Sequence, residues 1–129
     1  MQTIDEAVKE LDEAVNNKDI EAVLDFYEDE ALLVIQPGRI ARGKLELRKF
    51  FEAVFDMNTN AKQIATNVME TGDIALFISK WVAEGRTPDG NEFSNINIAT
   101  SVFRKSADGK WRLLIDNSFG PEVLNIQNA

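Results

Sequence analysis

The side chains that could do chemistry in this 129-residue chain are of few types, because the sequence contains neither His nor Cys. The lack of Cys excludes disulfides, thiolate nucleophiles and zinc–thiolate sites. The lack of His removes the commonest general base and the usual transition-metal ligand. Any catalysis would therefore depend on carboxylates, lysines, amides, the backbone or the single tyrosine, Tyr27. Tyr27 could donate a hydrogen bond to a ligand carbonyl, or it could simply pack with its hydroxyl group at a rim.

Acidic residues dominate the charge of the chain. The run Glu28-Asp29-Glu30 could hold a metal, but consecutive acidic residues in a turn are typical of a solvated helix end. We therefore expect neither a metal nor a cofactor. The formal net charge is −8, so the chain would be repelled by phosphate groups. This repulsion argues against binding to nucleic acid or to an anionic membrane.

Length and composition are those of one globular domain covering residues 1–129. Hydrophobic residues make up 44% of the chain and charged residues 28%, which allows one buried core. No apolar run is long enough to cross a bilayer, and the N-terminal residues lack the features of a secretory signal. We therefore expect a soluble, cytoplasmic protein.

The first half of the chain has helical periodicity. A helix is predicted from about Thr3 to Asn16, where Thr3 and Glu6 have the spacing of a capping box. Its apolar side faces a core, and its opposite, solvent-facing side carries Glu6, Lys9, Asp12 and Glu13. Asp19 should cap a second helix that carries Phe26 and Tyr27 near its end. A buried strand at 31–35 and a third helix at about 44–57 follow.

The second half has the two-residue periodicity of strands. Four strands are predicted, at about 61–70, 74–84, 92–105 and 110–119. Asp-Gly occurs at two of the three connections, and this dipeptide favours tight hairpin turns. The pattern predicts an α+β fold in which about three N-terminal helices pack on one face of a curved, mostly antiparallel sheet.

The order of these elements resembles the SnoaL-like and ketosteroid-isomerase-like families of the nuclear transport factor 2-like superfamily. The residues that carry the resemblance are short structural signatures spread over most of the chain: Asn17-Lys18-Asp19, Phe26-Tyr27, Asp29-Glu30-Ala31, Pro37-Gly38, Arg42-Gly43-Lys44, Phe50-Phe51, Asp108-Gly109-Lys110-Trp111 and Asp116-Asn117-Ser118-Phe119-Gly120. The resemblance implies a cone-shaped, cystatin-like fold with a conical pocket and an outer sheet face that pairs two subunits. Family members include isomerases, cyclases, dehydratases, epoxide hydrolases and binding modules, so the fold does not fix the reaction.

Strand alternation then assigns faces within this topology. The residues expected to line a ligand pocket are Tyr27, Gln36, Phe51, Phe55, Phe77, Ser79, Trp81, Asn97, Ser101, Asn117 and Phe119. The residues expected on the subunit-pairing face are Ile96, Ile98, Thr100, Val102 and Leu114. A pocket of aromatic residues with a few amide and hydroxyl groups would suit a small, largely apolar ligand. Arg39 and Arg42 would lie near the mouth of the cone and could attract an anionic ligand.

The residues of a steroid isomerase are absent from the matching positions. The base of that enzyme falls at Ile35 or Gln36, and its two oxyanion donors fall near Leu11 and Ser101. The resemblance to SnoaL-type cyclases, which use a pocket Asp as acid and base, makes Asp116 the catalytic candidate, with Asn117 as an orienting amide. Strict alternation points Asp116 away from the cone, although a β-bulge would reverse its direction. Otherwise Asp116 would be a surface residue, or would pair with Arg104 or Arg112.

Three functions stay open at this point. The first is a homodimeric domain that binds a small molecule without catalysis. The second is an isomerase, cyclase or dehydratase that uses carboxylate acid–base chemistry, and it requires Asp116 to point inward. The third is an oligomerisation module, for which the cone would be filled by side chains.

Overall fold

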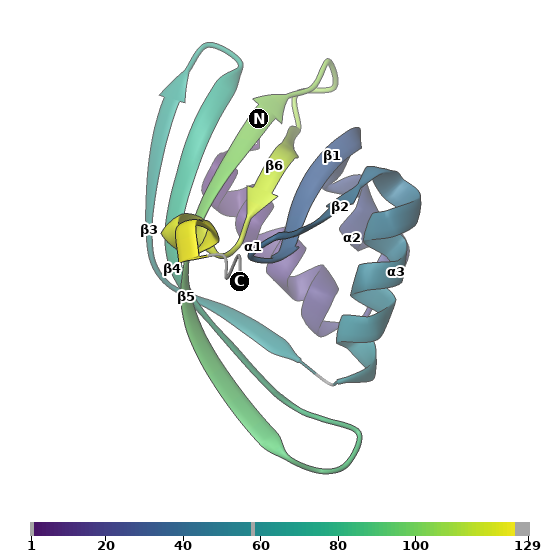
Figure 1. Cartoon of the computed structure of the whole chain (residues 1–129). Coiled ribbons are helices and arrows are strands. Elements are labelled where there is room, and N and C mark those ends of the chain that lie inside the picture. The colour runs from purple at the N-terminus through teal and green to yellow at the C-terminus, as the bar shows by residue number, and fades with distance from the viewer. Residues whose placement is uncertain (1, 58, 126–129) are drawn as a thin grey trace.

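The structure is a computed structural model that describes residues 2–57 and 59–125. Its helices lie on one side of a curved six-stranded sheet (Figure 1). The helices are α1 (Ile4–Asn16), α2 (Ile20–Asp25) and α3 (Gly43–Asp56). The strands are β1 (Tyr27–Gln36), β2 (Arg39–Arg42), β3 (Asn60–Thr71), β4 (Ile74–Arg86), β5 (Glu92–Lys105) and β6 (Trp111–Asn117), and a short 3-10 helix, η1 (Gly120–Asn125), follows. Within the described residues, no helix is long and apolar enough to cross a membrane.

The sheet is mixed, with the strand order β2-β1-β6-β5-β4-β3. Among the described strands, only the pairing of β1 with β6 is parallel, and the other pairs are antiparallel. The strands β3 to β6 form the predicted meander, and their tight turns use glycines such as Gly72 and Gly109 with positive φ. The predicted α+β architecture, with helices on one face of a mostly antiparallel sheet, is therefore confirmed.

The helix starts follow from local sequence. At α1, the Thr3 hydroxyl accepts from the amide of Glu6 (3.1 Å), and the Glu6 carboxylate accepts from the amide of Thr3 (2.7 Å). This reciprocal arrangement satisfies two amides that the helix leaves unpaired. At α2 the Asp19 carboxylate caps the helix by accepting from the amide of Ala22 (3.2 Å).

The second helix is shorter than predicted, and this changes the position of Tyr27. The helix ends at Asp25, and Tyr27 is the first residue of β1. The amide of Leu113 donates to the carbonyl oxygen of Phe26 (2.8 Å), and Tyr27 pairs with Leu113 in the parallel ladder. Pairing with a strand that lies far along the chain therefore ends the helix. The acidic run that follows lies within β1, not at a solvated helix end, and Glu28 forms an ion pair with Arg104.

The β5–β6 pairing contains a β-bulge that reverses the direction of the last side chains of β6. Val102 pairs with Ile115, but the next residue, Phe103, pairs with Leu113, so Leu114 is an extra residue on β6. An inserted residue shifts the alternation by one position. As a result Asp116 lies opposite Ser101 on the inner face, while Ile115 is exposed on the outer face.

Side chains from the helices and the inner face of the sheet form the core. Large buried members include Tyr27, Leu47, Phe77 and Phe103, and the Phe77 and Phe103 rings meet edge to face with centroids 5.8 Å apart. After β6 the chain turns at Gly120, which has a φ of 51°. A Cβ atom there would lie 2.5 Å from the carbonyl oxygen of Ile98, so only glycine fits this approach. This turn fixes the positions of the residues just before it, Ser118 and Phe119.

Candidate functional site

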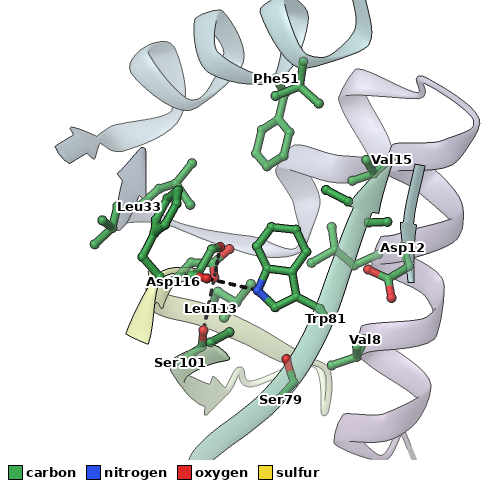
Figure 2. A pocket seen from close by; sticks show the side chains of 18 of the residues that line it. Val8, Asp12, Val15, Leu33, Phe51, Ser79, Trp81, Ser101, Leu113 and Asp116 are labelled. Carbon is green, nitrogen blue, oxygen red and sulfur yellow. Dashed lines mark hydrogen bonds between the residues drawn. The ribbon is translucent and has the colours of Figure 1, made fainter. Parts of the chain in front are cut away.

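A cavity of about 300 Å³ lies between the helices and the inner face of the sheet. Aromatic and aliphatic side chains from α1, α3 and five of the strands make up most of its wall. The polar residues that border it are Asp12, Tyr27, Thr59, Gln63, Ser79, Trp81, Ser101, Asp116 and Ser118. Figure 2 shows that Asp12 and Asp116 reach this space from different walls. The site is therefore apolar overall, with its polar atoms on a few defined side chains.

Asp116 lies in the cavity wall because of the bulge at Leu114. Tyr27 Oη donates to Asp116 Oδ2 (2.6 Å), and the hydroxyls of Ser101 (3.1 Å) and Ser118 (3.3 Å) donate to Oδ1. This corrects the outward direction that strict alternation predicts. The suggested Arg partners are engaged elsewhere, since Arg104 pairs with Glu28, and Arg112 pairs with Asp25 and Asp108.

Burial raises the pKa of Asp116, and the hydrogen bonds from Tyr27, Ser101 and Ser118 oppose this shift. The same environment raises the pKa of Tyr27 well above its usual range, because burial and the nearby Asp116 charge both disfavour a phenolate. Tyr27 therefore stays protonated at neutral pH, and its hydroxyl donates the hydrogen bond that holds the carboxyl group of Asp116 in place. Three donors on one carboxyl group fix its orientation at the cavity wall.

A second carboxyl group, that of Asp12, borders the cavity from α1. It accepts a hydrogen bond of 3.1 Å from Gln63 Nε2 on β3. Burial raises the pKa of Asp12 to about 6; the charge of Asp116 also raises it, and the Gln63 hydrogen bond opposes the shift. Asp12 therefore changes its charge close to neutral pH.

The sequence placed Asp12 on the solvent-facing side of its helix, and the structure corrects this. The start of β3 lies against that side of α1, where the Asn16 side chain accepts from the amide of Ala61 (3.0 Å). Val8, Asp12 and Val15 consequently all border the cavity, at helical spacing. The only sequence signal was this spacing, which does not reveal that a distant strand packs against that side of the helix.

Part of the predicted pocket set does line the cavity: Tyr27, Phe51, Phe77, Ser79, Trp81, Ser101 and Phe119. The structure places Gln36, Phe55, Asn97 and Asn117 outside the lining. An irregularity between Val34 and Gln36 puts both Val34 and Ile35 on the cavity side and leaves Gln36 exposed.

The other three differences also have local causes. The bulge at Leu114 turns Asn117 away, so that its amide donates to Thr100 Oγ1 (3.1 Å) and to the Gly120 carbonyl (3.2 Å). Phe55 packs on the Phe51 ring, with centroids 6.4 Å apart, behind the wall. Asn97 pairs across the strands with Trp81, and the larger indole of Trp81 forms the wall at this level.

Two polar atoms at the cavity wall are buried and lack a hydrogen-bond partner in the described part of the chain. They are Ser79 Oγ and Gln63 Oε1. An unsatisfied buried polar group costs about 1–3 kcal/mol, so a native protein rarely keeps one without a reason. Among residues 2–57 and 59–125, no three acidic side chains gather as a metal site would require.

Comparison with known proteins defines the family. Residues 8–114 match the family described as the SnoaL-like domain. The chain belongs to the SnoaL-like domain family. This confirms the resemblance seen in the sequence. Comparison with curated proteins found no match.

Solved structures similar to this SnoaL-like domain cover most of it. A ketosteroid isomerase-like protein from Erwinia carotovora atroseptica is 28% identical, with a TM-score of 0.69 over 88% of this chain and 89% of that one. A cystatin-like protein of unknown function from Nostoc punctiforme is 25% identical, with a TM-score of 0.72 over 88% and 84%. The S. rosetta CaMKII hub, at 22% identity, has a TM-score of 0.74 over 88% and 90%, which shows likeness of fold alone. The predicted cystatin-like, nuclear transport factor 2-like fold is confirmed.

The raised pKa of Asp12 predicts a change of stability with pH. Its pKa in the folded protein, about 6, lies above the usual 3.8, so its contribution to stability is present at low pH and is lost as the pH rises through 6. The isosteric Asp12→Asn variant cannot ionise. Relative to wild type, its free energy of unfolding should therefore increase by roughly 1 kcal/mol between about pH 5 and pH 7.5.

Urea unfolding followed by tryptophan fluorescence at several pH values would measure this difference. The control is Glu13→Gln, because Glu13 is the neighbouring, exposed carboxylate on the same helix. A difference between Asp12→Asn and wild type that stays constant over the pH range would show that the Asp12 pKa is not raised.

Proposed function

We propose that this SnoaL-like domain binds a small, largely apolar molecule in the cavity, with a polar group of the ligand near Asp12, Gln63 and Ser79. The observation that carries the proposal is the open cavity of about 300 Å³, which has aromatic walls and a few polar side chains. Small-molecule sites in proteins have this size and composition. An assembly module would instead fill its cone with side chains, so the open space favours binding over a purely structural role.

The unpartnered atoms support the same function. Ser79 is only 2% exposed, and its hydroxyl has no hydrogen-bond partner in the described chain. The Gln63 amide oxygen is also buried and also lacks a partner there. A bound molecule that hydrogen-bonds to them would remove the cost of leaving them unsatisfied. The two atoms therefore act as specific contacts within an otherwise apolar site.

Blocking the cavity should abolish binding of a small aromatic probe. We expect 2-naphthol to bind wild type with one site per chain in isothermal titration calorimetry. Ala61→Phe should weaken this binding at least about tenfold, because Ala61 borders the cavity and the added ring would occupy it. The matched control is Ala65→Phe, at an exposed position of the same strand outside the lining. Equal affinities for the two variants would place the binding site elsewhere.

A second candidate function is proton transfer at a carbon next to a carbonyl group. It is favoured by Asp12, whose pKa of about 6 lets the carboxylate accept a proton near neutral pH. The inward direction of Asp116 meets the requirement set out from the sequence. Asp12 would remove the proton, and the same group would return it at the original or a conjugated carbon, as an isomerase does.

This second function predicts isotope exchange. Wild type in D₂O should accelerate deuterium incorporation next to the carbonyl of 2-tetralone, as measured by proton NMR. Asp12→Asn should reduce the enzyme-dependent rate at least about 100-fold, since a positioned base contributes this much. Glu13→Gln should leave the rate unchanged. Exchange no faster than in buffer, or an unaffected Asp12→Asn variant, would rule out Asp12 as the base.

We further propose a homodimer that pairs through the outer face of the sheet. A cross-strand row of apolar residues runs over this face through Met69, Leu76, Val102 and Ile115. Ile96 and Ile98 extend the row along β5 and are exposed, by 61% and 38%. Contiguous exposed apolar surface of this kind is typical of an interface. The bulge adds Ile115 to this face.

Light scattering of the purified chain tests the dimer. The expected mass is about twice the 14.5 kDa of one chain. Leu76→Lys should give monomers, because it buries a charge in the centre of the interface. Leu45→Lys is the control, since Leu45 is an exposed leucine on α3, away from the sheet face. A monomeric wild type at micromolar concentration would overturn the proposal.

A further inference from the structure

The hydrogen-bond donors that line the cavity are largely engaged with protein acceptors. The hydroxyls of Tyr27, Ser101 and Ser118 all donate to Asp116. The indole Nε1 of Trp81 donates to the carbonyl oxygen of Ser118 (3.0 Å), and the Thr59 hydroxyl donates to that of Val54 (3.4 Å). A hydroxyl or indole has a single hydrogen to donate, so these groups have none left for a ligand.

The acceptors of the cavity, in contrast, have unused capacity. An ionised Asp12 can only accept, so Gln63 must turn its amide nitrogen toward it. That orientation leaves the amide oxygen, Gln63 Oε1, as the atom without a partner, and an amide oxygen is an acceptor only. The unpartnered hydroxyl of Ser79 can accept as well as donate. The best complement to this end of the cavity is therefore a group with several donors.

The charge of the lining points in the same direction. It contains the carboxyl groups of Asp12 and Asp116 and, among the described lining residues, no Lys or Arg. Arg39 and Arg42, which the sequence suggested for an anionic ligand, are exposed and lie outside the lining. Aromatic rings border the space, among them those of Phe51 and Trp81, and the π-face of an aromatic ring attracts cations. The carboxylates of the lining would repel an anionic ligand, whereas a cationic ligand would compensate their negative charge.

We infer that the ligand of this cavity is a small apolar molecule bearing a protonated amine, whose ammonium group donates to Asp12 and to Gln63 Oε1. The inference rests on the proposed binding function and names the chemical class of its ligand. An ammonium supplies three donors and one positive charge, which match the acceptors and the negative charge left unused at this end. Charge-assisted hydrogen bonds in a site shielded from water are stronger than neutral ones, so the amine should be preferred over an alcohol of the same shape.

Three probes with one apolar body test the inference: 2-naphthylmethylamine, 2-naphthylmethanol and 2-naphthoate. In calorimetry at about pH 7.5, the amine should bind at least about tenfold more tightly than the alcohol, and naphthoate should bind most weakly. If the alcohol or naphthoate binds as tightly as the amine, the amine inference is overturned while binding in the cavity stands. If none of the three probes binds, the proposed binding function fails, and this inference fails with it.

Asp12 variants identify the atom responsible. Asp12→Asn should lower the affinity for the amine to that for the alcohol and leave the alcohol affinity within about twofold, because only the charge is removed. Glu13→Gln should keep the full preference. An amine preference that survives in Asp12→Asn would overturn the role assigned to Asp12.

Proton release gives an independent measurement on the wild type. The ionisable groups bordering this space are Asp12, Asp116 and Tyr27; the pKa of Asp12 is raised to about 6, and burial raises the pKa of Asp116 too. An ammonium favours the ionised form of Asp12, so amine binding at about pH 6 should release protons, seen as a dependence of the calorimetric heat on buffer ionisation enthalpy. The alcohol should release none. Proton uptake with the amine, or equal release with both probes, would contradict the inference.

Discussion

The hydrogen bond of 2.6 Å between Tyr27 and Asp116 is the contact on which the site depends. It joins the first residue of β1 to the end of β6, the two strands that form the parallel pair of the sheet. It forms only because the second helix ends at Asp25 and because the bulge at Leu114 turns Asp116 inward. Helix length, strand register and the direction of one carboxyl group are therefore coupled.

This arrangement has an energetic cost that the surrounding structure must offset. Placing a carboxyl group in an apolar cavity disfavours its ionised form, and the raised pKa values of Asp116 and Asp12 express this cost. The hydroxyls of Tyr27, Ser101 and Ser118 compensate Asp116 in part, and the amide of Gln63 compensates Asp12. No cation among the described lining residues completes the compensation. The cavity is therefore electrostatically complementary to a cationic ligand.

Local signals in the sequence predicted most of the fold. The capping box at Thr3, the cap at Asp19 and the Asp-Gly turns depend on a few neighbouring residues, and these features appear where expected. The end of α2, the short strand β2 and the bulge at Leu114 depend on pairing between distant segments, which periodicity does not encode. A one-residue insertion in register reverses every later side chain. Strict alternation therefore gave Asn117 the inward direction that Asp116 has.

The candidate site lies where the chain departs from the rules that hold along the rest of the sheet. The bulge interrupts the alternation of β6, and two carboxyl groups border an apolar cavity. The two buried polar atoms without a partner in the described chain, on Gln63 and Ser79, border that same cavity. Proteins keep such locally unfavourable features mainly where function requires them. Their convergence from α1, β3, β4 and β6 on one space marks it as the candidate site by physical criteria, although none of the short signatures that carry the family resemblance is a catalytic motif.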